Sequence, residues 1–304
     1  MASERVEPGQ EWLAQRERGS VATIRILVWI ALKLGRRAAR LLLYPICLYF
    51  LVFSHGTKLA SRAYLARVLG RKPRLADVFR HYHSFSSCAL DRVFLFNDRI
   101  DLFDLRIQDE DMVLDILRQG SGCFLLGAHL GSFEVMGALG RRQPDLRISM
   151  AMYEENAQKI GSVLKAINPN LAIDVVGLGQ FSSMIEVQDR LDRGHAMGVL
   201  ADRGLGGEKV VRYPFLGAPA AFPLGPFRII AIMKRPVVLM FGLYRGGRRY
   251  DIFFEVLANP AEWPAGDRAE EIDKMMRRYV ERLEHYCRLA PYNWFNFYDF
   301  WKWR

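Results

Sequence analysis

The stretch GCFLLGAHLGSFE, residues 122–134, contains the pattern that decides the fold. Its first half is an uninterrupted apolar run, which is typical of a strand buried on both faces of a sheet. Its second half has small residues that permit a tight turn, and the residues that follow have the apolar spacing of a helix. A buried strand that leads through a short turn into a helix is the repeating unit of α/β proteins.

The same alternation continues to the end of the chain. Short apolar runs predict further strands at 147–153, 172–176, 196–201, 237–244 and 250–256. Helical periodicity predicts helices near 111–118, 133–142, 155–167, 179–193 and 224–233, and a long amphipathic helix at 267–289. Gly246 and Gly247 join two strand-like runs and indicate a hairpin. We therefore predict an α/β fold with a mixed, mostly parallel central sheet flanked by helices.

The segment before this body is basic as well as apolar. Between Arg18 and Ala76 there is no Asp or Glu, but there are twelve basic residues: Arg18, Arg25, Lys33, Arg36, Arg37, Arg40, Lys58, Arg62, Arg67, Arg71, Lys72 and Arg74. Twelve exceeds the net charge of the whole chain, +10, so the excess is local. Basic residues beside apolar runs favour an anionic membrane surface. Nucleic-acid-binding arms usually lack such apolar runs, so we expect no nucleic-acid partner.

Two apolar runs, 21–34 and 41–53, precede a basic amphipathic stretch at 57–70. Neither run reaches the roughly 20 residues of a membrane-spanning helix, so each fits an interfacial or partly inserted helix better. There are two alternatives to interfacial helices. Both runs could form core helices of a soluble domain, or they could form a single tilted membrane-spanning helix through Pro45. The predicted organisation is a polar N-terminus (1–20) without a signal peptide, a membrane-associated helical region (21–75) and an α/β domain (76–304).

The strand that ends before His129 places this residue where α/β proteins hold their ligands. Glu134 follows five residues later, about 140° around a regular helix, so the two side chains meet only if His129 lies on the turn. Gly131 permits the tight bend, and Ser132 is the expected N-cap. Glu134 would then accept a proton from one imidazole nitrogen, leaving the other free as a general base. Backbone N–H groups at the helix start would stabilise an oxyanion.

Other candidate residues lie after further predicted strands along the chain or on a later helix. Asp202 and Arg203 come after an apolar strand and before a glycine-rich loop, where Arg203 would hold a phosphate or thioester donor or, alternatively, form an ion pair that anchors the loop. Arg228, on the helix after Pro226, is expected to face the same cleft. Asn156 follows the second predicted strand and is either a substrate contact or a helix cap.

The four cysteines, at positions 47, 88, 123 and 287, form no C-x-x-C pair. Widely spaced cysteines in apolar surroundings are typical of reduced, buried thiols, and they indicate neither a zinc site nor a redox motif. We expect no metal and no organic cofactor.

The ordered blocks of this sequence resemble one enzyme family. GAHLGSFE (127–134) is similar to the H-x-x-x-x-[DE] block of the lysophospholipid acyltransferase superfamily, and more closely to the bacterial lipid A late-acyltransferase family. ADRG (201–204), VRYPFLGAP (211–219) and FPLGP (222–226) resemble further blocks of that family in the same order. The tail PYNWFNFYDFWKWR (291–304) departs from the pattern, because it is aromatic where the family is rich in His and Arg. In this it looks more like the acyltransferases of aryl-polyene or polyketide-type lipid pathways, so the resemblance does not identify lipid A as the acceptor.

This resemblance implies an enzyme at the cytoplasmic face of the bacterial inner membrane. It would transfer a fatty-acyl group from an acyl thioester, on acyl carrier protein or coenzyme A, to a hydroxyl or amine of a lipid-like acceptor. His129 and Glu134 would be catalytic. The expected substrate-binding residues are Gly131, Ser132, Asp202, Arg203, Arg228 and Asn156. Two alternatives remain at this point: a non-catalytic membrane-peripheral scaffold, and a thioesterase-like hydrolase that uses the same site.

Overall fold

A seven-stranded sheet forms the centre of the computed structural model, which describes residues 21–142, 146–153, 167–168, 174–179, 181–204, 208–264 and 268–302. Its strands, in spatial order, are β1 (Asp104–Gln108), β9 (Arg249–Ala258), β8 (Val237–Gly246), β2 (Cys123–Gly127), β5 (Ala196–Leu200), β3 (Ile148–Tyr153) and β4 (Asp174–Leu178). Every pair is parallel except β8 with β9, whose hairpin turns at Gly246 and Gly247. The predicted mixed, mostly parallel sheet is confirmed.

Both faces of the sheet are covered by helices, as the unbroken apolar run of β2 requires. Phe124 and Leu126 of β2 pack into a core with α7 (Phe181–Asp192), α8 (Gly225–Met233) and α9 (Arg268–Leu289). Cys123 and Leu125 face the opposite core, with α4 (Glu110–Arg118) and α5 (Glu134–Gly140). All four of these side chains are fully buried. The predicted helix at 155–167 lies outside the described residues, apart from its last residue.

The sequence analysis missed three strands and two short 3₁₀ turns. β1 is a short strand at the edge of the sheet with only alternate residues partly buried. β6 (Val210–Phe215) and β7 (Ala218–Pro223) form a separate antiparallel hairpin. Pro214, Pro219 and Pro223 lie within this hairpin, and prolines argue against a strand when only the sequence is known. The 3₁₀ turns are Ile100–Leu102 and Pro260–Glu262.

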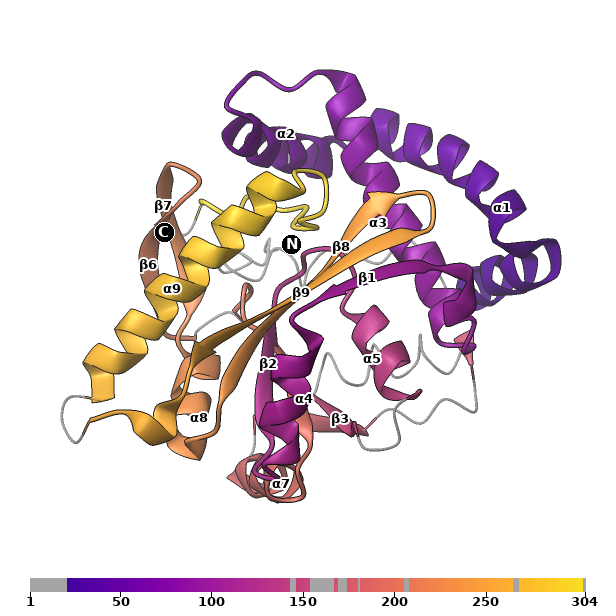
Figure 1. Ribbon diagram of the computed structural model, residues 1–304. Coiled ribbons are helices and arrows are strands. Elements are labelled where there is room, and N and C mark those ends of the chain that lie inside the picture. Colours follow the sequence, from indigo (N-terminus) through magenta and orange to yellow (C-terminus); the bar gives the residue numbers. More distant parts are fainter. Residues whose placement is uncertain are drawn as a thin grey trace, which may run out of the picture.

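Three helices precede the sheet: α1 (Val21–Phe53), α2 (His55–Leu69) and α3 (Leu75–Leu95). The two apolar runs join into α1, which is interrupted at Gly35 (φ 80°, ψ 164°). Figure 1 shows these helices gathered at one end of the molecule, beside the tip of the β8–β9 hairpin. Arg36 and Arg40 of α1 donate hydrogen bonds to the carbonyl of Gly247 at that tip. The N-terminal helices are therefore joined to the carboxyl end of β8.

Within the described part of the chain, no single helix combines the length and apolar character needed to cross a membrane. One pair of consecutive helices, Ile26–Phe53 and His55–Leu69, meets those criteria together, but the pair is bent by 96°.

Candidate active site

The loop between β2 and α5 holds the residues that the sequence pattern singled out. β2 ends at Gly127 and α5 begins at Glu134, so His129 lies on the turn and Glu134 lies in the first turn of the helix, as predicted, although the helix begins one residue later than expected. Gly131 has φ 73°, and a Cβ at this position would lie 2.0 Å from the carbonyl oxygen of Gly242. Only glycine fits this bend, because any other residue would be strained and would collide with β8.

Ser132 does not cap the helix. The N-cap position belongs to Phe133, while the hydroxyl of Ser132 donates to Oε2 of Glu134 at 2.9 Å. The N–H of Ser132 donates to Gly242 O, and the N–H of Gly131 donates to Asn293 O, each at 2.8 Å. These two N–H groups are bonded within the protein, and the expectation that N–H groups at the helix start stabilise an oxyanion stays a prediction.

His129 pairs with Asp202. Nδ1 of His129 lies 2.8 Å from Oδ1 of Asp202, and the backbone N–H of His129 donates to the same oxygen at 3.1 Å. The two residues follow β2 and β5, which are neighbouring parallel strands, so their carboxyl ends meet at one edge of the sheet. Because an ionised carboxylate only accepts hydrogen bonds, Nδ1 carries the proton and Nε2 keeps its lone pair.

Asp202 is completely buried and its charge is compensated by several donors. Oδ2 accepts hydrogen bonds from Nε1 of Trp294 at 2.9 Å and from Nδ2 of Asn296 at 3.2 Å. Burial alone would raise the pKa of Asp202, but His129, Arg203 and the Trp294 indole hold it well below its usual range. The carboxylate therefore stays ionised and holds one imidazole tautomer.

The environment of His129 favours a neutral base. Burial lowers the pKa of the imidazole, and the charge of Arg203 lowers it further, while Asp202 and Glu134 act in the opposite direction. The side chain still exposes 33% of its surface, so a substrate can approach it. A neutral imidazole with a fixed tautomer and an available Nε2 is suited to taking a proton from a hydroxyl or amine.

Comparison with known proteins shows the family of this chain. A model of the bacterial lipid A biosynthesis acyltransferase family matches residues 14–303. The chain belongs to this family. It is therefore an acyltransferase, in class EC 2.3.1, of a lipid-biosynthesis family whose members are generally associated with the bacterial inner membrane. No curated protein matches the chain. The family match does not separate branches, so the aryl-polyene branch stays a prediction.

Glu134 of this acyltransferase contacts residues other than the histidine. Its Oε1 lies 2.5 Å from Nη2 of Arg92 on α3, and its Oε2 accepts the hydrogen bond from Ser132. Among the hydrogen bonds of the described residues, none joins Glu134 to His129, and the nitrogen expected to donate to Glu134 is bonded to Asp202. The carboxylate is still close enough for its charge to favour protonation of His129.

Arg203 holds the C-terminal segment of the acyltransferase. Its Nε donates to Oδ1 of Asn296 at 2.5 Å and its Nη2 to the carbonyl of Phe295 at 2.7 Å, while the guanidinium lies 5.9 Å from the Tyr298 ring centroid. Arg203 is thus adjacent to the His129–Asp202 pair. The expected role as a donor-binding residue stays a prediction.

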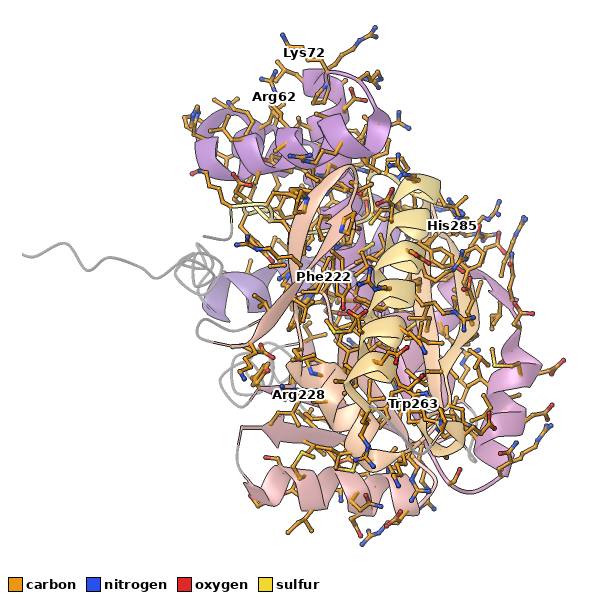
Figure 2. All side chains as sticks on the ribbon, turned by 90° about the vertical axis from the view of Figure 1, so that its left-hand side faces the viewer. Arg62, Lys72, Phe222, Arg228, Trp263 and His285 are labelled. Atoms are coloured by element: carbon orange, nitrogen blue, oxygen red, sulfur yellow. The ribbon has the colours of Figure 1, made fainter. Side chains whose placement is uncertain are left out.

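Of the remaining candidates, only Arg228 lies within the described residues. Arg228 is exposed on α8, and no contact between it and His129 or Asp202 is seen within the described ranges. Figure 2 shows Arg228 well away from Arg62 and Lys72, which project from the end formed by the N-terminal helices. Asn156 lies outside the described residues. The same holds for the polar N-terminus, residues 1–20.

The polar role of the aromatic tail was not expected from the sequence. Trp294 and Asn296 bind Asp202 from 92 and 94 residues away. A tail rich in Trp and Asn side chains, each with an N–H group that must find an acceptor when buried, was the available signal.

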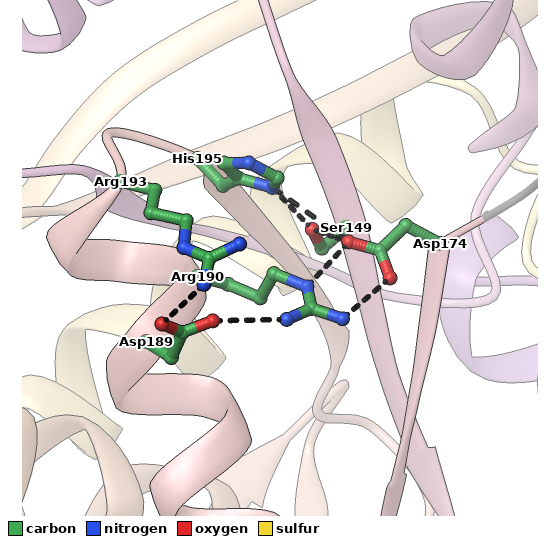
Figure 3. Close-up of polar contacts among 6 residues, drawn as sticks. All are labelled: Ser149, Asp174, Asp189, Arg190, Arg193 and His195. Carbon is green, nitrogen blue, oxygen red and sulfur yellow. Dashed lines mark hydrogen bonds and ion pairs between the residues drawn. The ribbon is translucent and has the colours of Figure 1, made fainter.

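A second Ser, His and Asp cluster lies at the opposite edge of the sheet, where β3, β4 and β5 begin. Ser149 donates to Oδ2 of Asp174 at 2.6 Å and lies 2.7 Å from Nδ1 of His195, and Arg190 also pairs with Asp174 (Figure 3). The single hydroxyl proton points to the carboxylate, so His195 must donate to Ser149 and cannot act as its base. This cluster joins strand ends and is not a nucleophilic triad. No group of three His, Cys, Asp or Glu side chains in the described ranges is placed to hold a metal ion.

Proposed function

We propose that this acyltransferase moves a fatty-acyl group from an acyl thioester to a hydroxyl or amine of a lipid-like acceptor. Nε2 of His129 takes the acceptor's proton as the acceptor attacks the thioester carbonyl. The tetrahedral intermediate then breaks its C–S bond, and the departing thiolate receives the proton from the imidazolium. The observation that supports this proposal is the bond between His129 Nδ1 and Asp202 Oδ1, which leaves Nε2 unprotonated.

Two carboxylates would contribute differently to this step. Asp202 would hold the tautomer and stabilise the imidazolium through a direct hydrogen bond. Glu134 would act through its charge, since its oxygens are bonded to Arg92 and Ser132. Arg203 would meet the donor or the developing oxyanion, because its guanidinium already influences the pKa of His129.

The donor would be acyl carrier protein, an acidic protein. The chain has a net charge of +10, and Lys72, Arg74 and Arg80 are exposed beside the N-terminal helices. A basic surface attracts an acidic protein and speeds its encounter. Coenzyme A is the alternative donor, and a direct comparison of the two thioesters at low and high salt separates them: only carrier-protein turnover should fall steeply with salt.

The lipid surface would lie along α1 and the start of α2. Large apolar side chains are exposed there in unusual number: Ile26, Leu27, Trp29, Leu32, Leu34, Leu41, Leu42, Tyr44, Leu48, Tyr49, Phe50, Val52, Phe53 and Leu59. Exposed apolar side chains on a helix that also carries the exposed Lys33 and Arg37 are suited to an anionic bilayer. This face is not the buried surface expected of core helices in a soluble domain. Flotation with vesicles that contain anionic lipid, compared with zwitterionic vesicles, tests it.

The decisive experiment for the chemistry uses the purified full-length protein with radiolabelled acyl carrier protein thioester and lipid extract. Wild type should give acylated lipid, and His129→Ala should give none while its melting temperature is unchanged. Turnover near the wild-type rate in folded His129→Ala would refute the proposal. Free fatty acid as the main product would instead support the thioesterase-like alternative.

The acceptor can be sought with the same protein. Lipid extracts of cells with and without the gene, compared by mass spectrometry, should differ by one acyl group on the acceptor. A change in lipid A would assign the family's usual acceptor. A change in an aryl-polyene lipid would instead support the branch suggested by the aromatic tail.

A further inference from the structure

The C-terminal strap, defined here as residues 293–298, lies across the carboxyl ends of β2, β5 and β8. The N–H of Phe295 donates to the carbonyl of His129 at 2.8 Å, and Leu130 forms a β-bridge with Trp294. Asn293 bonds both backbone groups of Tyr244 on β8, with Oδ1 accepting at 2.7 Å and Nδ2 donating at 3.1 Å. The strap therefore fixes the backbone of the histidine loop from one side and β8 from the other.

Two side chains of the strap also fix the orientation of Asp202. Trp294 and Asn296 both donate to Oδ2, which leaves Oδ1 directed at His129. Asn296 uses its own oxygen to accept from Nε of Arg203, so it bridges the carboxylate and the guanidinium. Trp294 is fully buried and Asn296 nearly so, which means that neither donor has water as an alternative partner.

We infer that Trp294 and Asn296 are positioning residues, which set the orientation and charge of Asp202 and through it the basicity of His129. This inference rests on the proposed role of His129 as general base. Trp294 and Asn296 of the strap thus support the catalytic pair, although neither residue needs to touch a substrate. A displacement of about 1 Å at a general base is enough to cost about 100-fold in rate.

The strap is itself held by His81 of α3 and by residues of α2, the helix that follows the proposed lipid surface of α1. Nε2 of His81 donates to the carbonyl of Trp294 at 2.8 Å, and its Nδ1 accepts from Ser61 of α2 at the same distance. The pKa of His81 is lowered to about 4 by burial, so it stays neutral and keeps these roles. Tyr64 of α2 packs against the Trp294 ring with centroids 5.0 Å apart. These contacts connect α2 to Asp202 through buried groups.

The first test removes one hydrogen bond and keeps an aromatic ring. Trp294→Phe deletes the indole N–H that donates to Asp202, and it should lower kcat by about 10- to 100-fold with little change in KM. The matched control is Trp301→Phe, which deletes an indole N–H that donates at 3.3 Å to Phe215 O, away from Asp202. The control should keep activity within about twofold. Equal activity in the two variants would overturn the inference for Trp294.

The second test changes charge at constant size. Asn296→Asp keeps an oxygen for Arg203 but replaces the amide donor with a carboxylate oxygen about 3.2 Å from Oδ2 of Asp202. Arg203 donates to the oxygen that is kept at position 296, so its guanidinium compensates the second carboxylate, and the added negative charge raises the pKa of His129. The acid limb of kcat/KM should therefore move to higher pH. A purely structural role would lower the amount of folded enzyme without moving the limb, and an unmoved limb in the folded variant overturns the inference for Asn296.

Different results would refute the general-base role of His129 and the positioning role of Trp294 and Asn296. Activity retained in folded His129→Ala refutes the general-base proposal itself. Activity abolished in His129→Ala, but unchanged in both Trp294→Phe and Asn296→Asp, refutes only the positioning role of the strap.

Discussion

Nδ1 of His129 and Oδ1 of Asp202 lie 2.8 Å apart although 73 residues separate them in the chain. The contact depends on strand order, because β5 and not β3 lies beside β2 in the sheet. Gly127 pairs with Leu200, so the residues that follow these two positions emerge side by side. The short polar stretch at 201–204 thus supplies the partner of the histidine in the stretch at 127–134.

Asp202→Asn should disable the histidine without removing it. An amide in place of the carboxylate can present its NH₂ to the ring, which favours the tautomer that carries the proton on Nε2. We expect kcat to fall by about 10²- to 10⁴-fold, as for other histidine bases that lose an orienting carboxylate. Steady-state kinetics on folded protein measure this, and a loss of less than about fivefold would argue against the pairing.

Glu134→Gln separates the two carboxylates. Glutamine can still accept from Ser132, but it has no charge for Arg92 or for the imidazolium. Since no hydrogen bond to His129 is lost, the expected fall in kcat is about tenfold, which is smaller than for Asp202→Asn. A greater loss in Glu134→Gln than in Asp202→Asn would instead indicate that Glu134 contacts the histidine directly during turnover.

The pH profile should follow the lowered pKa of His129. A general base must be neutral, so kcat/KM should fall as pH drops through the pKa of the free enzyme and should be flat above it. Burial and Arg203 place this pKa below the usual value of 6.5, so the acid limb should lie below that pH. Glu134→Gln removes a negative charge that raises the pKa, so its limb should lie lower still. A wild-type limb above pH 6.5 would contradict the assignment.

The local parts of this site were predictable and the long-range parts were not. The buried run before His129, the bend at Gly131 and a helix with Glu134 in its first turn depend only on nearby residues, and all three are confirmed, although Ser132 is not the N-cap of that helix. Spacing also suggested that Glu134 was the partner of His129. That inference compared residues near in sequence, whereas the bonded carboxylate comes from the adjacent strand β5.

Sheet order could not be predicted from the sequence, which indicated strands before Asp202 and Asn156 but not which strand adjoins β2. β5 lies beside β2, so Asp202, which follows β5, emerges next to His129. Asn156 lies outside the described residues. The strap could not be assigned at all, because nothing in a tail of aromatic residues specifies that Trp294 and Asn296 will meet a carboxylate 92 and 94 residues earlier.

Gly131→Ala tests whether the bend before α5 is sterically required. The new Cβ would lie 2.0 Å from Gly242 O, and the alanine would have to adopt φ 73°. The loop must therefore move away from β8. Gly217→Ala is a matched control: φ there is 80°, but no atom lies within 4 Å of the Cβ position. The control should lose about 1 kcal/mol from the backbone strain alone, and it should remain active. Gly131→Ala should lose more stability and nearly all activity, and similar melting temperatures for the two variants would contradict the predicted collision.

Arg36 illustrates why the basic residues of the N-terminal segment are not equivalent. Its guanidinium forms two hydrogen bonds with the buried Asp91, at 2.7 and 2.8 Å, and Tyr250 donates to the same carboxylate at 2.8 Å. Burial raises the pKa of Asp91, and the Arg36 charge opposes that rise. This arginine therefore joins α1 to α3 and β9, and it is not available to a lipid headgroup.

Arg36→Met should accordingly destabilise the fold, whereas Arg37→Met should not. Loss of Arg36 leaves Asp91 buried without its cation, at a cost of about 3–5 kcal/mol in the free energy of unfolding. Part of this cost should be relieved at acidic pH, where Asp91 can protonate. Arg37 is exposed, so its replacement should change stability by less than about 0.5 kcal/mol and instead weaken binding to anionic vesicles. Denaturant unfolding of the detergent-solubilised protein and vesicle flotation measure the two effects. Equal destabilisation by both variants would show that the Arg36–Asp91 pair does not anchor α1.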